Sequence, residues 1–280
     1  MNNIHVDFWG VRGSVPSPGP KTARYGGNTS CVSITYGNKI LILDAGTGIR
    51  NLGTSIIGKP ELEIFVIVTH THWDHIQGFP FFTPIYQPNR PVNMFPTLHK
   101  KNVVLSSLID QMDGAHFPIT PDQVPSNFNF ITENPLNFLE DNGFKIELVP
   151  MNHPGGAFGY KIIFGDKSIC YFTDNEIDPP YEKSIELKDL IQHCNNVDVL
   201  IHDAQYIEED MPLKHGWGHS LISQVTDLAK SAKVKNLVYY HHDPERSDDD
   251  LDALFTDAKN SLSQTEVKAH FAYEGLRLSI

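Results

Sequence analysis

The sequence lacks the features of an exported or membrane-bound protein. It has only three cysteines, Cys31, Cys170 and Cys194, and no CxxC pair. An odd and sparse set of this kind predicts reduced thiols and no disulfide framework. No apolar run approaches the roughly 18 residues that span a bilayer, and the N-terminal residues show no basic region followed by an apolar one, so no signal peptide is expected. We therefore expect a soluble, cytoplasmic protein with no membrane partner.

Positive charge is also scarce. The chain has 22 Lys and Arg against 34 Asp and Glu, which gives a net charge of −12. A broad surface for nucleic acid would need clustered basic residues, so a large nucleic acid is not expected as a partner. A small anionic substrate remains compatible with this charge, because bound divalent cations can dominate the field inside a site.

Short apolar runs, rich in β-branched and aromatic residues and separated by Gly, Asn and Asp, predict strands. The expected strands are Ile4–Trp9, Val32–Tyr36, Ile40–Leu43, Ile64–Val68, Lys145–Pro150, Tyr160–Phe164, Ser168–Phe172, Val197–Ile201, Asn236–Tyr240 and Val267–Tyr273. Helices are expected at about Tyr181–Cys194, Ser220–Lys233 and Ser247–Ser263. No linker divides the chain, so residues 1–280 are expected to form one α/β domain.

The stretch from Phe79 to Asn142 differs from the rest, because it is rich in Pro, Asn and Phe and its strand pattern is weak. We interpret it as an insertion that lies over the active site. An ordinary long connection with one or two helices fits the pattern equally well. Phe117, Phe128 and Phe130 within it could stack on a base, although core packing explains such residues more often.

The clearest functional pattern follows the apolar run Ile64–Val68. There the segment Thr69-His-Thr-His-Trp-Asp-His75 contains four residues of metal-ligand type, namely His70, His72, Asp74 and His75. Ligands at this spacing cannot all converge from one regular strand or helix. They can converge if the first two lie on a loop at the strand's end and the last two open a helix. Imidazole and carboxylate ligands suit zinc, manganese or iron.

This HxHxDH pattern after a hydrophobic strand resembles the metallo-β-lactamase superfamily, whose fold is a four-layer αββα sandwich with metals at one edge. The resemblance implies further ligands on later loops. His153 matches in Met151-Asn-His-Pro-Gly-Gly156, and Asp174 matches in Tyr171-Phe-Thr-Asp-Asn-Glu176. The last ligand is His241 or His242, and the position of Pro244 favours His241. The implied metal sites are His70, His72, His153 and Asp174 for one ion, and Asp74, His75, Asp174 and His241 for the other.

Two N-terminal segments resemble the RNase Z-like and cyclic-nucleotide phosphodiesterase branch of that superfamily. Phe8-Trp-Gly-Val-Arg-Gly-Ser-Val-Pro16 is similar to its Gly-rich opening, and Arg24-Tyr-Gly-Gly-Asn-Thr-Ser30 to its Asn-Thr-Ser element. Arg12 offers a forked donor for phosphate oxygens. The resemblance implies that Arg12 and Asn28 bind substrate. A tight turn with a solvated Arg12 is the alternative.

Two further elements resemble the same family. Ile201-His-Asp-Ala-Gln205 with Gly218-His-Ser220 is similar to paired segments in which a carboxylate orients a histidine that acts on the phosphate. This implies that Asp203, one methylene shorter than the family's Glu, orients His219, with Ser220 beside the substrate. Helix capping is the alternative role for His219. In Leu43-Asp-Ala-Gly-Thr-Gly48, the resemblance implies that Asp44 supports the ligand loop and fixes an imidazole tautomer.

The resemblance implies a phosphodiesterase with two divalent ions, for which zinc is favoured and manganese or iron are alternatives. A metal-bridging hydroxide would attack phosphorus, Asp74 would accept its proton and His219 would protonate the leaving oxygen. The basic arm of tRNA-processing relatives is missing, so a small phosphodiester is expected, with a cyclic nucleotide as the leading candidate. The alternatives are RNA 3′-processing or hydrolysis of a cyclic sugar phosphate and, further away, thioester or lactone hydrolysis. Relatives are frequently dimers, so a homodimer is an open possibility.

Overall fold

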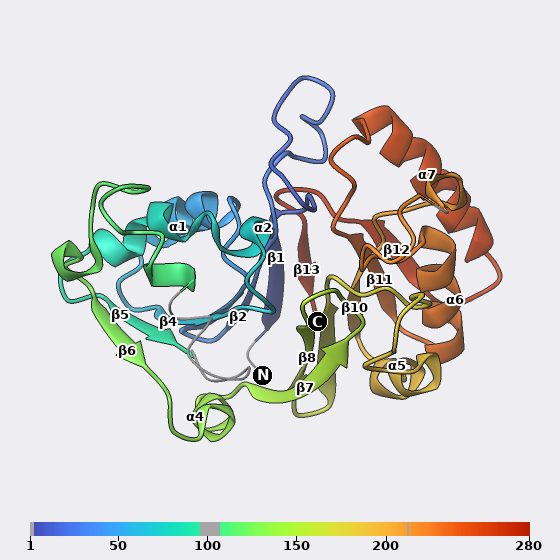
Figure 1. The fold of residues 1–280 in the computed structure, drawn as a ribbon. Helices are drawn as coiled ribbons and strands as arrows, with labels where there is room; N and C mark the ends of the chain where they lie inside the picture. The colour runs from blue at the N-terminus through green and yellow to red at the C-terminus, as the bar shows by residue number, and fades with distance from the viewer. Residues whose placement is uncertain (1–2, 96–106, 212) are drawn as a thin grey trace. The chain divides into compact units, whose positions relative to one another are not determined.

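The computed structural model describes residues 3–95, 107–211 and 213–280. The chain divides into two compact units. Unit 1 comprises Met1–Pro16, Gly26–Gly143 and Tyr273–Ile280, and unit 2 comprises Ser17–Tyr25 and Phe144–Ala272. Each unit contains one sheet (Figure 1). Within the described ranges, no helix has the length and apolar character needed to cross a membrane.

Unit 1 contains a seven-stranded sheet in the order β13-β1-β2-β3-β4-β5-β6. Its strands are β1 (Ile4–Gly10), β2 (Cys31–Tyr36), β3 (Lys39–Leu43), β4 (Glu63–Ile67), β5 (Pro91–Met94), β6 (Asn127–Phe130) and β13 (Arg277–Ser279). The pairs from β13 to β3 are antiparallel, and those from β3 to β6 are parallel. Its helices are α1 (Ile49–Ile56), α2 (Trp73–Ile76) and α4 (Pro135–Asp141), with short 3₁₀ turns η1 (Phe79–Phe81), η2 (Thr83–Tyr86) and η3 (Pro121–Gln123).

One face of this sheet forms the core of unit 1. Alternate residues of a strand point to the same face, so Ile40 and Ile42 of β3 lie beside Ile64 and Val66 of β4 in one buried cluster. The buried side of α1, which includes Leu52, packs in the same cluster. Burial of these aliphatic side chains supplies the main stabilisation, at about 25 cal/mol per Å² of apolar surface.

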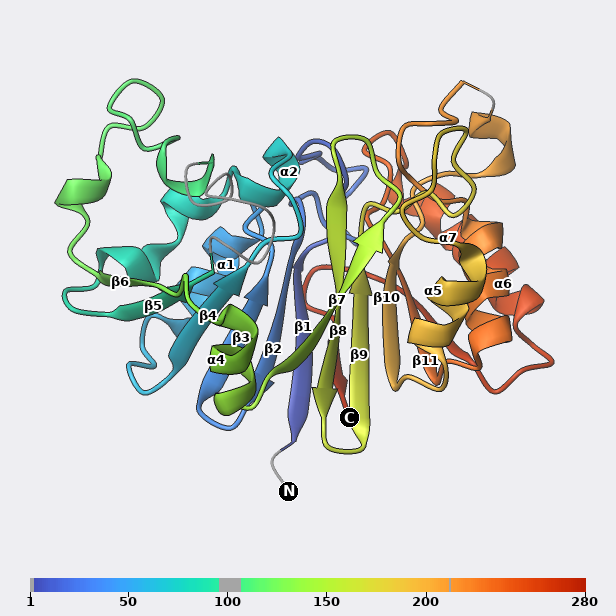
Figure 2. The ribbon, with the colours of Figure 1, turned by 60° about the horizontal axis from the view of Figure 1, so that its bottom comes forward.

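Unit 2 contains a six-stranded sheet in the order β12-β11-β10-β9-β8-β7, whose strands lie side by side in Figure 2. The strands are β7 (Lys145–Met151), β8 (Ala157–Phe164), β9 (Lys167–Phe172), β10 (Val199–Asp203), β11 (Asn236–Tyr240) and β12 (Lys268–Phe271). β9 to β12 are parallel, and β7, β8 and β9 are joined antiparallel. The helices are α5 (Leu187–Cys194), α6 (Ile222–Ala232) and α7 (Asp248–Ser261), with the 3₁₀ turn η4 (Glu208–Asp210).

The helices of unit 2 cover one face of its sheet. Phe172 of β9 and Leu237 of β11 share a buried cluster with Leu228 of α6 and Leu251 of α7. α7 begins as its sequence predicts, because the Ser247 hydroxyl accepts a hydrogen bond from Asp250 N at 3.2 Å and three acidic residues occupy the first turn.

Two sequence predictions about elements were wrong. The predicted helix Tyr181–Cys194 begins only at Leu187, because Asn152 Oδ1 accepts hydrogen bonds from Ser184 N (2.7 Å) and Ile185 N (3.0 Å) and holds that segment in a non-helical conformation. The second error is one of omission: the helix α1 and the strands β5, β6 and β13 were not anticipated.

β5 and β6 lie inside the stretch that was interpreted as an insertion, and they extend the parallel half of the unit 1 sheet. Their asparagines hid the strand pattern. Asn93 donates to Ile64 O at 3.0 Å, and Asn129 donates to Asn93 Oδ1 at 3.1 Å, so the polar groups are satisfied inside the sheet. Residues 96–106 of this stretch lie outside the described residues. The position of the stretch over the active site stays a prediction, as does the single domain.

Candidate metal centre

The HxHxDH segment lies where the sequence predicted, at the carboxyl end of β4. β4 ends at Ile67, and α2 begins at Trp73, directly after an extended His72. The loop carries His70 and His72, and the first turn of α2 carries Asp74 and His75. The ring centroid of His70 is 4.4 Å from that of His72 and 4.4 Å from that of His75. Unit 1 therefore brings these ligand-type residues together.

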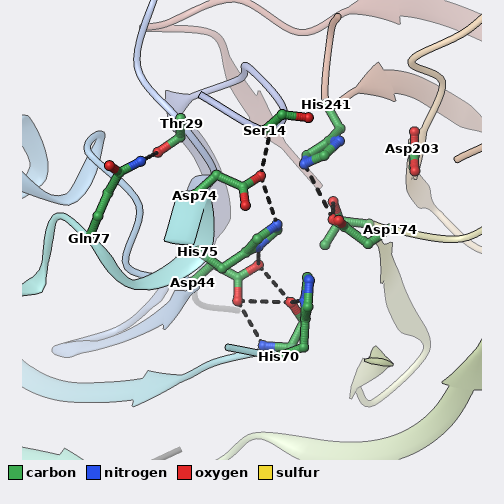
Figure 3. Close-up of polar contacts among 12 residues, drawn as sticks. Ser14, Thr29, Asp44, His70, Asp74, His75, Gln77, Asp174, Asp203 and His241 are labelled. Carbon is green, nitrogen blue, oxygen red and sulfur yellow. Dashed lines mark hydrogen bonds and ion pairs between the residues drawn. The ribbon is translucent and has the colours of Figure 1, made fainter. Parts of the chain in front are cut away.

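Asp44 supports this loop from the neighbouring strand. It follows β3, is fully buried and has a left-handed backbone with φ +65°. Its carboxylate accepts a hydrogen bond from Thr69 N at 2.7 Å and lies 2.8 Å from His75 Nδ1 (Figure 3). A carboxylate at Nδ1 keeps the proton on that nitrogen and leaves the lone pair on Nε2. The support that the sequence implied for Asp44 is thus present.

Asp74 is positioned by both the backbone and its helix. It is 5% exposed, and its Oδ2 accepts a hydrogen bond from Ser14 N at 2.8 Å (Figure 3). The same oxygen lies 3.3 Å from His75 Nε2. A buried carboxylate oxygen beside an Nε2 lone pair is an electron-rich pair of donor atoms, which is the arrangement that a divalent cation stabilises.

Unit 2 gathers three further ligand-type residues at one edge of its sheet. His153, Asp174 and His241 follow β7, β9 and β11, which all run in the same direction, so their carboxyl ends share that edge. Asp174 Oδ1 lies 3.3 Å from His241 Nε2 (Figure 3), and Asp174 Oδ2 lies 3.7 Å from His153 Nε2. Asp174 and His241 both have left-handed backbones, with φ +52° and +61°.

The histidines share one bonding pattern. Nδ1 of His153 lies 3.0 Å from Gly218 O, and Nδ1 of His241 lies 2.9 Å from Gln205 Oε1. As in His75, an oxygen acceptor occupies the Nδ1 side, and Nε2 faces a carboxylate oxygen. Histidines that bind metal through Nε2 almost always place the other ring nitrogen against such an acceptor. The donor sets of both units therefore fit divalent metal ions.

The structure separates the two candidate histidines after β11. His241 lies beside Asp174, as described above. His242 Nε2 lies 2.8 Å from Ala272 O, and its ring packs against Tyr25 and Phe271 at centroid distances of 5.8 and 5.5 Å. The contacts of His242 are therefore those of a core residue, which agrees with the preference for His241. The role of His241 as a metal ligand stays a prediction.

Asp203 and His219 form a close pair, as the sequence implied. Asp203 ends β10, and its Oδ2 lies 2.6 Å from His219 Nδ1. The shorter side chain reaches because Asn175 N (3.2 Å) and Gln205 N (3.1 Å) also bond this carboxylate and fix its position. The His219 ring stacks on that of His241, with centroids 5.0 Å apart.

The surroundings of His219 are buried and acidic. Tyr206 meets the His219 ring edge-on at 5.5 Å. Burial raises the pKa of Tyr206 well above its ordinary value, and the Asp203 carboxylate raises it further, so its hydroxyl stays protonated. Burial also lowers the pKa of His202, which keeps that neighbouring imidazole neutral.

Three predicted substrate contacts find other partners. Arg12 is fully buried, and its Nε donates to Gly26 O at 2.9 Å. Asn28 gives its backbone N–H and its side-chain amide to Glu274, at 2.7 and 2.9 Å. Ser220 is fully buried and donates its hydroxyl to Asn175 O at 2.5 Å. The Arg12 and Ser220 side chains are not exposed in this structure, and the substrate contacts of Arg12, Asn28 and Ser220 stay predictions.

Two residues of the centre were missed from the sequence. Gln205 holds His241, and Glu176 accepts hydrogen bonds from Gly216 N (2.8 Å) and Gly218 N (2.9 Å). Each lies two residues after an acidic residue of the centre, Asp203 or Asp174. That spacing was visible, but their partners are distant in the sequence and could not be identified from it.

Comparison with known proteins identifies the family of this chain. A family model described as "Beta-lactamase superfamily domain" matches residues 39–242. Ribonuclease Z from Staphylococcus epidermidis is 25% identical over 320 aligned positions, which cover 96% of this chain and 97% of that protein.

Solved structures show the same fold. The metallo-β-lactamase fold protein YhfI from Bacillus subtilis has a TM-score of 0.69 and 17% identity, covering 99% of this chain and 100% of that one. Unliganded yeast PDE1 has a TM-score of 0.65 and 13% identity, covering 100% of both. These likenesses confirm the α/β fold class expected from the sequence. Because the family model spans more than half of its length, the chain belongs to the β-lactamase superfamily and is a hydrolase with the metallo-β-lactamase fold.

Proposed function

We propose that this hydrolase is a two-metal phosphodiesterase that acts on a small phosphodiester, with a cyclic nucleotide as the leading candidate. The observation that carries the proposal is the Asp203–His219 pair, with 2.6 Å between Oδ2 and Nδ1, beside His241. A histidine held in this way is suited to protonate a leaving oxygen. An alkoxide needs that proton, whereas a thiolate is a much weaker base and leaves without it.

The proposed metal ligands are the two sets that the family resemblance implied. His70, His72, His153 and Asp174 would hold one ion, and Asp74, His75, Asp174 and His241 the other. The Nδ1 contacts of His75, His153 and His241 support this assignment, because they leave Nε2 of each ring as the donor. Zinc is favoured for a set of imidazoles and carboxylates, with manganese or iron as alternatives. Bound divalent ions would polarise the phosphoryl group and lower the pKa of an attacking water toward ~7.

The remaining chemistry belongs to side chains of this chain. Asp74, held by Ser14 N, would accept the proton of the attacking water. His219 would donate the proton on its Nε2 to the leaving oxygen. Asp203 would stabilise the charged imidazolium through the Nδ1 contact, since an opposite charge at that distance favours the protonated form.

A small substrate is supported by charge. The net charge is −12, and the stretch 79–142 has only Arg90, Lys100 and Lys101 as basic residues. Arg90 donates to Lys59 O at 2.7 Å and Leu62 O at 3.0 Å and is 4% exposed, so it is not part of a basic surface. RNA 3′-processing is the second candidate, because the Ribonuclease Z relative spans 96% of this chain. Hydrolysis of a cyclic sugar phosphate would use the same groups.

The test is a hydrolysis screen of metal-loaded protein. It includes 3′,5′- and 2′,3′-cyclic nucleotides, bis-p-nitrophenyl phosphate, a tRNA precursor and acyl thioesters. We expect turnover of phosphodiesters, and turnover of thioesters alone would contradict the proposal. Cleavage of the tRNA precursor without cyclic nucleotides would favour the second candidate.

A variant pair tests the proton donor. His219→Ala should lower kcat by roughly 10²–10⁴-fold for a cyclic nucleotide. The loss should be much smaller for bis-p-nitrophenyl phosphate, because p-nitrophenolate leaves without protonation. His193→Ala on α5 is the control and should leave both rates near wild type. Equal losses on both substrates in His219→Ala would exclude the proposed role.

A further inference from the structure

The loop that leads to His219 displays an exposed tryptophan. Trp217 is 60% exposed and stands between two glycines, Gly216 and Gly218, whose φ angles are +91° and +92°. Left-handed angles of this kind are adopted readily only by glycine. The two glycines therefore form a turn that places the indole on the surface, two residues before His219.

This turn is held by a buried carboxylate. Glu176 is 1% exposed and accepts the N–H groups on both sides of the tryptophan, from Gly216 at 2.8 Å and from Gly218 at 2.9 Å. Hydrogen bonds to a charged acceptor are about twice as strong as neutral ones. Trp217 N also donates to Lys214 O at 3.1 Å. The backbone on either side of Trp217 is thus fixed before any substrate binds.

The same turn is connected to the candidate metal centre. Gly218 O accepts the Nδ1 contact of His153 at 3.0 Å. A Cβ on Gly218 would lie 2.2 Å from that Nδ1, so only glycine fits there. His219, the next residue, is held by Asp203. The backbone that carries Trp217 is therefore linked to a proposed metal ligand and to the proposed proton donor.

The other exposed tryptophan of the chain also lies near candidate site residues. The chain has three tryptophans. Trp73 is 65% exposed and stands between His72 and Asp74 of the HxHxDH segment. Trp9 is instead half-buried, donates to Ser33 Oγ at 2.9 Å and packs against the core of unit 1. Large aromatic side chains are normally buried, yet Trp73 directly adjoins two candidate ligands and Trp217 stands two residues before His219.

We propose that Trp217 is a specificity-determining residue whose indole stacks on the aromatic base of a nucleotide phosphodiester. This inference rests on the proposed function and names its substrate class. The backbone that carries this indole is already held by hydrogen bonds, two residues before the proposed proton donor, so a base can stack on the indole without an entropy cost for ordering the loop. Every base has a π-face, so stacking selects nucleotides over base-free phosphodiesters without selecting one base. Alanine substitution at such platforms costs roughly tenfold to a hundredfold in affinity.

The experiment compares a 2′,3′-cyclic nucleotide with the cyclic phosphate of glycerol, which has no base. The measured quantity is the ratio of kcat/KM for the two substrates. In Trp217→Ala this ratio should fall tenfold or more, mainly through a higher KM for the nucleotide. Trp217→Phe should retain most of the ratio, because phenylalanine keeps an aromatic face. Leu213→Ala, at an 86% exposed apolar residue of the same loop, is the matched control and should keep the wild-type ratio.

Two results would overturn the inference: an unchanged ratio in Trp217→Ala, or an equal fall in Leu213→Ala. A binding measurement separates this failure from that of the proposed function. Adenosine monophosphate, but not ribose 5-phosphate, should quench the tryptophan fluorescence of wild-type protein, and Trp217→Phe should lose most of that quenching. If neither phosphodiester is hydrolysed, the proposed function fails, and the quenching alone decides whether Trp217 stacks on a base.

Discussion

At the scale of single residues, backbone strain marks the candidate centre. Ser14, Asp44, Asp174 and His241 have φ angles between +52° and +65°, although none is glycine. Each such residue costs roughly 1–3 kcal/mol and persists only where surrounding contacts hold it. Asp44 is held by Thr69 and His75, and Asp174 lies against the imidazole of His241. These four are half of the eight non-glycine residues with a positive φ in the described part of the chain, and each is a candidate ligand or contacts one.

Replacing Asp44 by Asn should weaken metal binding. The amide cannot accept from both Thr69 N and His75 Nδ1 as the carboxylate does, so the Nε2 lone pair of His75 is no longer fixed. We expect metal affinity to fall roughly 10–100-fold, measured by competition with a zinc chelator. Asp166→Asn, in the exposed turn between β8 and β9, is the control. An unchanged metal affinity in Asp44→Asn would contradict the role of Asp44 in positioning His75.

His241 and His242 should respond differently to alanine. His241→Ala should lose about half of the bound metal and keep its fold. His242→Ala should keep its metal and lose about 1–3 kcal/mol of unfolding free energy, because it removes packing against Tyr25 and Phe271 and the contact with Ala272 O. Metal analysis and urea unfolding measure the two effects. The reverse pattern would show that the choice of His241 was wrong.

At the scale of elements, the ends of strands explain why much of the centre was predictable. Apolar runs identified β3, β4, β9 and β11, and the polar residues after them are the ones that the structure gathers at strand ends. β5 and β6 were missed, because their asparagines satisfy each other inside the sheet, as Asn93 and Asn129 do. A pattern based on hydrophobicity cannot recognise a pair of that kind.

The turn before His219 offers a test of element geometry. Gly218→Ala places a Cβ against His153 Nδ1 at φ +92°, so the turn must move. We expect the free energy of unfolding to fall by about 2 kcal/mol or more, of which about 1 kcal/mol comes from the left-handed angle and the rest from the clash. We also expect kcat to fall. Gly165→Ala, at φ +61° with no atom near the added Cβ, should show only the cost of the angle. Equal thermal and catalytic effects in the two variants would contradict the coupling of this turn to His153.

At the scale of the whole molecule, the sequence predicted the fold class and the family. The pairs that complete the centre were not predictable. Gln205 meets His241 across 36 residues, and Glu176 meets Gly218 across 42. Contacts between residues so far apart in the sequence depend on how loops are placed in the folded chain, and a local sequence pattern gives no information about that placement. The same limit applies to Arg12, whose burial could not be deduced from its place in a Gly-rich segment.

The stability of the whole chain should also depend on pH through His270 in β12. Burial lowers its pKa below 6.5, and Lys268 lowers it further. The folded state then binds fewer protons than the unfolded state between the two pKa values. The resulting stability is present above pH 6.5 and is lost as the pH falls toward the folded pKa. In His270→Gln the free energy of unfolding should decline less between pH 7 and pH 5.5, and parallel curves for the two proteins would contradict this.

The central claim is that the two ligand sets hold two divalent ions for phosphodiester hydrolysis. The most direct measurement titrates metal-stripped protein with zinc or manganese while following hydrolysis of bis-p-nitrophenyl phosphate. The account predicts no activity in the stripped protein and a rate that saturates at two equivalents per chain in at least one of the metals. Activity that survives stripping, or that saturates at one equivalent, would contradict it.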